Sequence, residues 1–313
     1  MKQHLRSICM VLAFLIGGIF YDELSPLSGW LPYGIGLMLT ISFMGINPAQ
    51  LKPRRLHVVL LVVLQLLAVA FWGLGLCMGD SALAQSLFFC AAAPVATASP
   101  VIVSLLRGNV AFMVTAMVLS QAVFAVVTPF VLPFVVLDDS LTYGELVWLV
   151  AEQLMSVMLV PALLAIMLRK LYPRCQTWPA KLKDFSLGLW NVNLTIVAAA
   201  GVQRLVEGQY SISLMWPLAL GAVVVCATGF LLGYRLGAPD FKRECSQALG
   251  QKNTIMTLYI AGQSYVSPLA YIGLVCYVFC HNIANAIQLA LANREKKRKV
   301  SHAGTASKKT HER

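Results

Sequence analysis

Residues 244–267 read ECSQALGQKNTIMTLYIAGQSYVS, with the run GQKN at 250–253 near the centre of an otherwise membrane-like segment. A cation at membrane depth costs ~3 to ~10 kcal/mol unless a cavity or a partner relieves it. Lipid-facing helices avoid that cost, so this stretch predicts a helix break that lines a site. The alternative is that Lys252 lies near a helix end and snorkels to water, but apolar residues continue beyond it to Ile260.

The composition places the chain among membrane proteins. Of its 313 residues, 58% are hydrophobic and 12% are charged, and the mean hydropathy is +0.74. A soluble domain carries about 25% charged residues. The eight cysteines lack C-x-x-C spacing, so neither a disulfide framework nor a zinc site is predicted. No metal-ligand cluster, nucleophile–base pair or phosphate loop is seen, so neither an enzyme nor a cofactor is expected.

Apolar runs between charged or Pro/Gly breaks predict an all-α polytopic protein with ten membrane spans. The N-terminal run lacks a small-residue cleavage pattern, so it is interpreted as a retained first helix. The predicted spans are 7–21, 31–47, 56–78, 82–106, 109–135, 143–170, 185–206, 212–235, 244–262 and 267–292.

The basic residues fall on one side of this arrangement. With ten spans, 22 of the 24 Lys and Arg lie in the terminal segments and alternate loops, the exceptions being Arg204 and Lys252. The positive-inside rule then predicts a multi-pass protein of the cell (inner) membrane with both termini cytoplasmic. The tail 294–313 is basic and is expected to be disordered near anionic lipid. Nucleic acid is not an expected partner.

The fourth span is interrupted in the same way as the ninth. Pro94 and Pro100 flank the polar residues Thr97 and Ser99. Proline removes a backbone donor and clashes with the preceding turn, so the middle of this helix is expected to unwind. Corresponding interrupted spans in two halves of a chain indicate a transporter binding site at an inverted-repeat interface. The alternative is that the prolines only kink a packed helix.

At these stretches the chain resembles the bile acid:sodium symporter family, part of the bile/arsenite/riboflavin transporter superfamily. The resemblance extends from about Ile8 to Asn293 in length, span count and order of motifs. The matching positions are Thr97-Ala98-Ser99, Arg107-Gly108-Asn109-Val110-Ala111, Gly250 and Asn253 of a GMQN-type motif, His281-Asn282, and Gln65 in span three.

The resemblance implies a single transmembrane transporter domain, 1–293, of ten helices in two inverted five-helix repeats. A panel (spans 1, 2, 6 and 7) would move against a core (spans 3, 4, 5, 8, 9 and 10), in which broken helices four and nine cross. Family members carry organic anions with two sodium ions. The substrate-binding positions that this resemblance implies are Thr97, Ala98, Ser99, Asn253, Thr254, His281 and Asn282.

The sequence departs from the family at both sodium sites. Ser99 matches one ligand of the first site, but the other positions are Pro100, Met113, Met117 and Ala248. The second site keeps Gln65 but has Lys252 where the family has glutamine. A hard cation needs several oxygen ligands, so sodium is not expected to bind. Glu244, one turn before Ala248, is either a substitute ligand or a helix-start carboxylate.

Lys252 is expected to replace a sodium ion as a tethered cation. Its predicted partners are Gln65 and the carbonyls of Ala248, Leu249 and Gln251; the coupling residues are therefore Lys252, Gln65, Ala248 and Gln251. The expected function is sodium-independent transport of an organic anion, either bile-acid-like or a small organic acid, by alternating access. This transport would be secondary-active or facilitative.

Three alternatives remain. One is a sodium-coupled symporter with a non-standard site, and another is a non-transporting membrane sensor. The third, cation–proton antiport, would need a titrating carboxylate such as Glu152.

Overall fold

The computed structural model describes residues 2–136, 141–263 and 265–311, and this part of the chain contains helices but no strand. A π-helical turn, Met155–Leu159, joins α8 to α9. The helices are α1 (Lys2–Ile19), α2 (Tyr21–Leu24), α3 (Leu31–Met44), α4 (Arg55–Cys77), α5 (Ser81–Ala92), α6 (Ser99–Leu105), α7 (Val110–Val136), α8 (Tyr143–Leu154), α9 (Val160–Leu171), α10 (Trp178–Lys181), α11 (Lys183–Glu207), α12 (Met215–Leu236), α13 (Lys242–Gly250), α14 (Thr254–Ala261) and α15 (Ala270–His311).

The chain is an all-α membrane protein. In the described part, 7 helical segments are long and apolar enough to cross a membrane, and the shorter apolar helices Ile8–Ile19 and Ser81–Ala92 accompany them. Each stretch predicted as a span coincides with one helix or with a pair of consecutive helices, to within a few residues at most boundaries. The fourth and ninth stretches are the split ones, each divided into two short helices.

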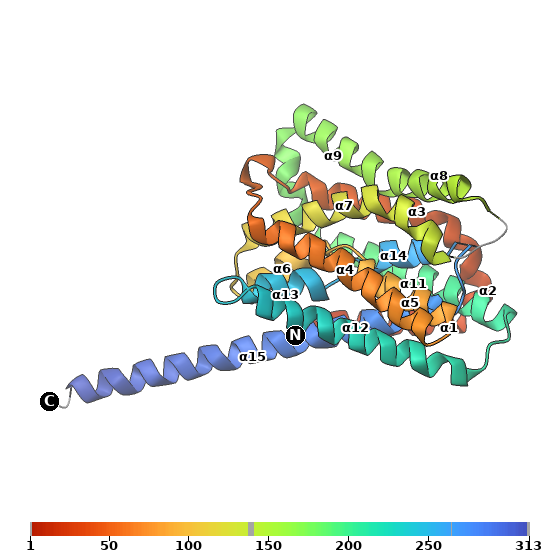
Figure 1. Cartoon of the computed structure of the whole chain (residues 1–313). Helices are drawn as coiled ribbons and strands as arrows, with labels where there is room; N and C mark the ends of the chain where they lie inside the picture. The colour runs from red at the N-terminus through yellow and green to blue at the C-terminus, as the bar shows by residue number, and fades with distance from the viewer. Residues whose placement is uncertain (1, 137–140, 264, 312–313) are drawn as a thin grey trace.

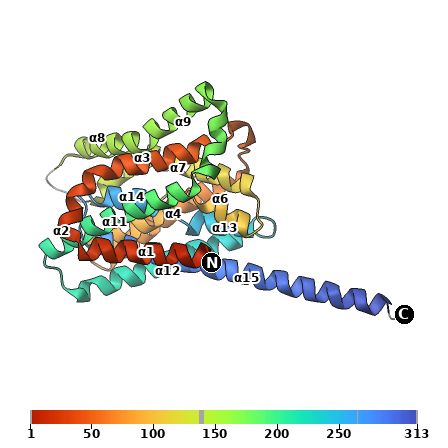
Figure 2. The ribbon, with the colours of Figure 1, turned by 180° about the vertical axis from the view of Figure 1, so that it is seen from behind.

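The tail differs from its prediction. Residues 294–311 were expected to be disordered, but α15 continues as a helix to His311. Lysine, arginine, alanine and glutamate all favour helix, and extending an existing helix avoids the cost of nucleation. Figures 1 and 2 show that the N-terminus lies beside the point at which α15 leaves the bundle. Both ends of the chain are therefore at the same end of the molecule.

The packing contacts largely separate the helices into two groups. In one group, α1 packs on α11 and α3 packs on α9. In the other, α4 packs on α5 and α12 packs on α13. The pairs correspond between the two halves of the chain: α5 contacts α12 and α15, and α13 likewise contacts α4 and α7.

Small residues allow α12 to approach α13 closely. Gly229, Gly233 and Gly237 are spaced four residues apart on α12 and its C-terminal cap. A Cβ atom at Gly229 would meet the carbonyl oxygen of Leu249, and one at Gly233 would meet that of Cys245. Small residues of this kind replace side-chain interdigitation with backbone contact in membrane helices.

This contact predicts a specific loss of stability. Gly233→Ala should lower the free energy of unfolding by about 1–3 kcal/mol, because the added methyl group overpacks a backbone contact. Gly73→Ala is the matched control, since a Cβ atom at Gly73 on α4 has nothing within 4 Å. Thermal unfolding of both purified variants, followed by circular dichroism, tests the difference. Equal midpoints would show that α12 and α13 are not in close contact.

Candidate functional site

Two helix breaks form the centre of the site. The first separates α5, which ends at Ala92, from α6, which begins at Ser99. The second separates α13, which ends at Gly250, from α14, which begins at Thr254. Both breaks fall where the sequence predicts them.

The breaks pair with one another through the backbone. The amide of Ala96 donates to the carbonyl of Gln251 at 3.0 Å, and the amide of Asn253 donates to the carbonyl of Pro94 at 2.7 Å. Val95 and Lys252 thereby form an isolated antiparallel bridge. Backbone groups released from a helix at membrane depth need such partners. The pairing holds the two short segments in a fixed relation.

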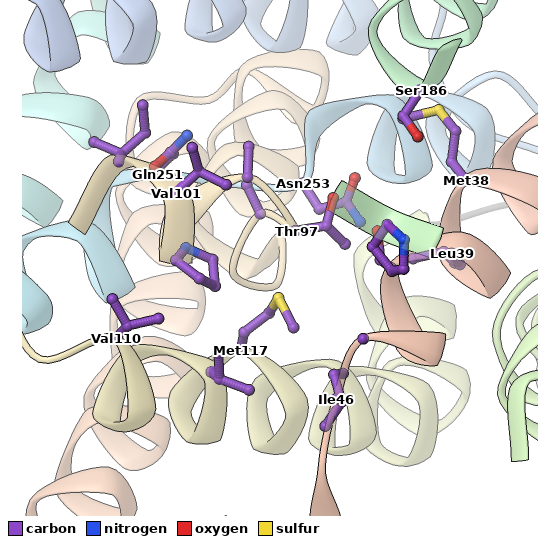
Figure 3. Close-up of a pocket in the computed structure, with 18 of the residues that line it drawn as sticks. Met38, Leu39, Ile46, Thr97, Val101, Val110, Met117, Ser186, Gln251 and Asn253 are labelled. Atoms are coloured by element: carbon purple, nitrogen blue, oxygen red, sulfur yellow. The ribbon is translucent and has the colours of Figure 1, made fainter. Parts of the chain in front are cut away.

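A large cavity reaches the paired breaks, which are called the crossing from here on. Its volume is about 1680 Å³, and its walls come from α3, α6, α7, α11, α15 and the two breaks. Thr97 and Asn253 lie next to each other at the cavity surface, with Met117 below them, while Gln251 lies further along beside Val101 (Figure 3). The paired breaks therefore present polar side chains to a space large enough for an organic molecule.

The cavity has a charged mouth. Lys52, Lys183 and Asp184 are exposed residues that also line it. Lys183 and Asp184 belong to the first turn of α11, while Asn253 lies at the paired breaks. The cavity thus opens at the end of the bundle that carries the basic loops, and it ends at the crossing.

Lys252 occupies a different position from the one predicted. Its side chain is 3% exposed, and its Nζ donates to the carbonyl oxygen of Ala91 at 2.9 Å. Ala91 lies in the last turn of α5, where the helix dipole favours a cation. The predicted contact with Gln65, which lies half-buried on α4, is not seen among the hydrogen bonds of the described residues.

The reason is the extended backbone of the second break. Gln251 has extended dihedral angles, and alternate side chains of an extended segment point to opposite faces. Gln251, Lys252 and Asn253 all line the cavity. The Nζ atom of Lys252 is nevertheless directed towards α5, where it donates to the carbonyl oxygen of Ala91.

The predicted substrate-facing residues come together with one exception. His281 is 5% exposed, and its Nδ1 atom has no partner among the described residues. Ser99 is the exception: its side chain is fully buried away from the cavity because it lies in the first turn of α6, facing the interior. The predicted residues that line the cavity are Thr97, Ala98, Asn253, Thr254, His281 and Asn282.

Several wall residues were not predicted. Asn285 lines the cavity one turn after His281 on α15, and its Oδ1 accepts a hydrogen bond from Gln247 at 2.8 Å. Gln251, predicted as a coupling residue, is a cavity residue whose Oε1 finds no partner in the described structure. The i, i+4 spacing of His281 and Asn285 was a signal that could have identified the second position.

The positions that the resemblance relates to sodium ligands lie in a mainly apolar region, with His57 and Ser120 as its polar neighbours. Ala248 is 2% exposed and packs in a cluster with Leu64, Val95, Met113 and Met117. A gap of about 10 Å³ remains beside Ala248, which is roughly the space for one water molecule. Thioethers and methyl groups do not satisfy a hard cation. The residues present therefore do not fit sodium.

Glu244 serves a helix start instead. Its Oε1 accepts a hydrogen bond from the amide of Asn109, immediately before α7 begins at Val110. The carboxylate is 3% exposed. This position agrees with the helix-start interpretation, in which a carboxylate stabilises the positive end of a helix dipole.

No protein-family model matches the chain, and no curated protein sequence matches it. The resemblance to a transporter family therefore rests on the sequence motifs alone.

The burial of Lys252 predicts that this lysine does not stabilise the fold. A buried charge is often replaced by a hydrophobic residue of similar volume at no cost in stability, or with a gain of about 1–4 kcal/mol. Lys252→Met should therefore keep or raise the thermal midpoint of the purified protein. The control is Lys183→Met, which changes an exposed lysine at the cavity mouth. A large drop in the thermal midpoint of Lys252→Met, but not of Lys183→Met, would show that Lys252 stabilises the fold.

Proposed function

We propose that this protein transports an organic anion across the membrane by alternating access. The observation that carries the proposal is the cavity, which opens at the basic end of the bundle and ends at two paired helix breaks. Binding sites of secondary transporters are built from discontinuous helices at the interface between repeats.

The packing supports an architecture of ten spans in two inverted repeats. The 7 long apolar segments, α1 and the two split stretches α5–α6 and α13–α14 supply ten crossings. The matching contacts of the two halves are those expected of repeated units, with α5 related to α13 and α4 to α12. In this proposal α1, α3, α8–α9 and α11 form the panel, the other spans form the core, and the chain is a divergent member of the bile acid:sodium symporter family.

The charges favour an anion. Lys52, Arg54 and Lys183 line the cavity against the single carboxylate of Asp184 among its described wall residues. The helix starts at Ser99 and Thr254 bring positive dipole ends to the crossing. A carboxylate bound beside Thr97 and Asn253 would meet hydrogen-bond donors as well as this positive field.

Lys252 is proposed to take the place of a coupling ion. Its Nζ atom lies at the paired breaks and donates to the carbonyl of Ala91, so the protonated side chain would supply a tethered positive charge there. The apolar cluster around Ala248 argues against a bound metal ion. Transport is therefore proposed to be sodium-independent, with coupling either to protons or to the anion gradient alone.

The alternatives receive less support. Glu152, which antiport would need as a titrating group, is exposed on α8 and does not line the cavity. A sodium-coupled symporter with a non-standard site would have to bind the ion away from Ala248. A non-transporting sensor would bind an anion without carrying it, and flux measurements separate that case from transport.

The test of the substrate site is uptake of radiolabelled organic acids, from small hydroxy acids to bile acids, into proteoliposomes. Thr97→Ala and Asn253→Ala should each weaken binding by about 1–3 kcal/mol, because each removes a half-buried hydrogen-bond donor at the cavity surface. Thr195→Ala is the control, since the Thr195 hydroxyl bonds to Asn191 within α11, away from the cavity. Unchanged affinity in both site variants would place the substrate away from the crossing.

A second test addresses the coupling ion. Replacing sodium with potassium or choline should leave binding and transport unchanged, because a metal ion ~4 Å from a fixed ammonium is opposed by ~4 kcal/mol at an effective dielectric of 20. Lys252→Gln should lose transport without becoming sodium-dependent, since Ala248 still provides no carboxylate. Ala248→Glu combined with Lys252→Gln is the variant expected to gain sodium stimulation. Saturable sodium stimulation of the wild-type protein would contradict the proposal.

The proposed location is the cell (inner) membrane, with both termini cytoplasmic. The basic residues at the cavity mouth then face the cytoplasm, and the structure is in an inward-open state. A periplasmic reporter enzyme fused after Arg313 should be inactive; activity would reverse this orientation.

A further inference from the structure

The end of the bundle opposite the cavity mouth is held closed by side-chain hydrogen bonds. They join α8 and α11 to the start of α15 and to the segment that precedes it. The three bonds are Tyr271 Oη to the carbonyl of Val197 at 2.6 Å, Arg204 Nη1 to the carbonyl of Gln263 at 3.0 Å, and Tyr265 Oη to Gln153 Oε1 at 3.0 Å.

A glycine makes the closest of these contacts possible. Tyr271 is 3% exposed, and its ring packs against the backbone of α11 at Gly201, where a Cβ atom would overlap the ring. Gly201 follows Val197, the acceptor of the Tyr271 hydroxyl, by one helical turn. Gly188 on the same helix differs, because a Cβ atom there has nothing within 4 Å.

The cavity and the contact made by Tyr271 lie at opposite ends of the same two helices, α11 and α15. On α11, cavity residues extend from Lys183 to Trp190, and the contact with Tyr271 begins at Val197, about 10 Å further along at ~1.5 Å per residue. On α15 the order is reversed: Tyr271 lies at the closed end and Asn285 lines the cavity. The helices thus touch at one end and are separated by the cavity at the other.

We propose that Tyr271, Arg204 and Tyr265, with their acceptors, form a clamp that must release before the site can open to the side opposite the present mouth. The inference rests on the proposed function, since it assigns the closed gate of the same transport pathway. All three acceptors are neutral oxygens. Arg204 and Tyr271 donate to backbone carbonyls, and Tyr265 donates to the side-chain amide of Gln153. Hydrogen bonds to neutral acceptors are weak enough to break in each cycle. Rotation of one helix group against the other would open this end and close the other.

The test is hydrogen–deuterium exchange of the full chain in lipid nanodiscs without added substrate. Gly201→Ala displaces the Tyr271 ring, and Tyr271→Phe removes its hydroxyl while keeping its volume. Loss of one such hydrogen bond should raise the opening equilibrium roughly fivefold. Exchange should become faster in residues 265–271 and 197–204. It should become slower in the cavity-lining residues 183–190, because that end closes.

Matched variants on α11 keep the test specific. Gly188→Ala adds a methyl group in open space, and Gln203→Ala removes a hydrogen bond to Glu207 within the helix; neither should change the exchange pattern. Faster exchange at 265–271 without slower exchange at 183–190 would overturn the clamp. Loosened packing around Tyr271 is enough to produce faster exchange at that end alone. Unchanged exchange in Tyr271→Phe would also overturn it, and this variant decides if Gly201→Ala does not fold.

The outcome is separable from the proposed function. Reciprocal exchange changes, combined with no effect of the organic acids on exchange or uptake, would leave the clamp in place and reject the anion substrate. Uptake of an organic acid without reciprocal exchange changes would keep the transport proposal and reject the clamp.

Discussion

The backbone pairing between the two helix breaks is the interaction on which the rest of the structure depends. Inside a bilayer no water is available to satisfy an unwound backbone, so each break would be costly alone. The hydrogen bonds from Ala96 to Gln251 and from Asn253 to Pro94 satisfy one break with the other. The amide of Val95 is in turn satisfied by the Ser120 hydroxyl at 3.1 Å. The pairing therefore stabilises both breaks at once and holds the two short segments in a fixed relation.

The same pairing decides which side chains reach the cavity. Gln251, Lys252 and Asn253 all line the cavity, while the Nζ atom of Lys252 is directed to the carbonyl of Ala91 on α5. The cluster around Ala248 is a packed apolar core, whereas the cavity beside it presents the polar side chains of Thr97, Gln251 and Asn253.

The sequence predicts the helices and their breaks well because both follow from strong local constraints. Proline at 94 and 100 prevents a continuous helix, and the long apolar runs mark the remaining segments. Side-chain directions inside the breaks were predicted less well. Ser99 faces the interior and Lys252 is directed away from Gln65, because a few backbone dihedral angles, set by the tertiary pairing, decide these directions. The helical tail was not predicted, because its high charge is typical of disordered segments, whereas its helix-favouring residues continue α15.

Under the proposed function, Lys252 would also link the paired breaks to the charge of the substrate. Its protein acceptor is a carbonyl rather than a carboxylate, so its positive charge is only partly balanced by a neighbouring dipole. Asn253 follows Lys252 in the chain. An anion bound beside Asn253 would therefore lie close enough to balance the positive charge of the Lys252 ammonium. Such stabilisation is mutual, because coupling between two sites has the same free energy in both directions. Under the proposed function, the binding of an anion would in this way depend on a cation that belongs to the chain itself.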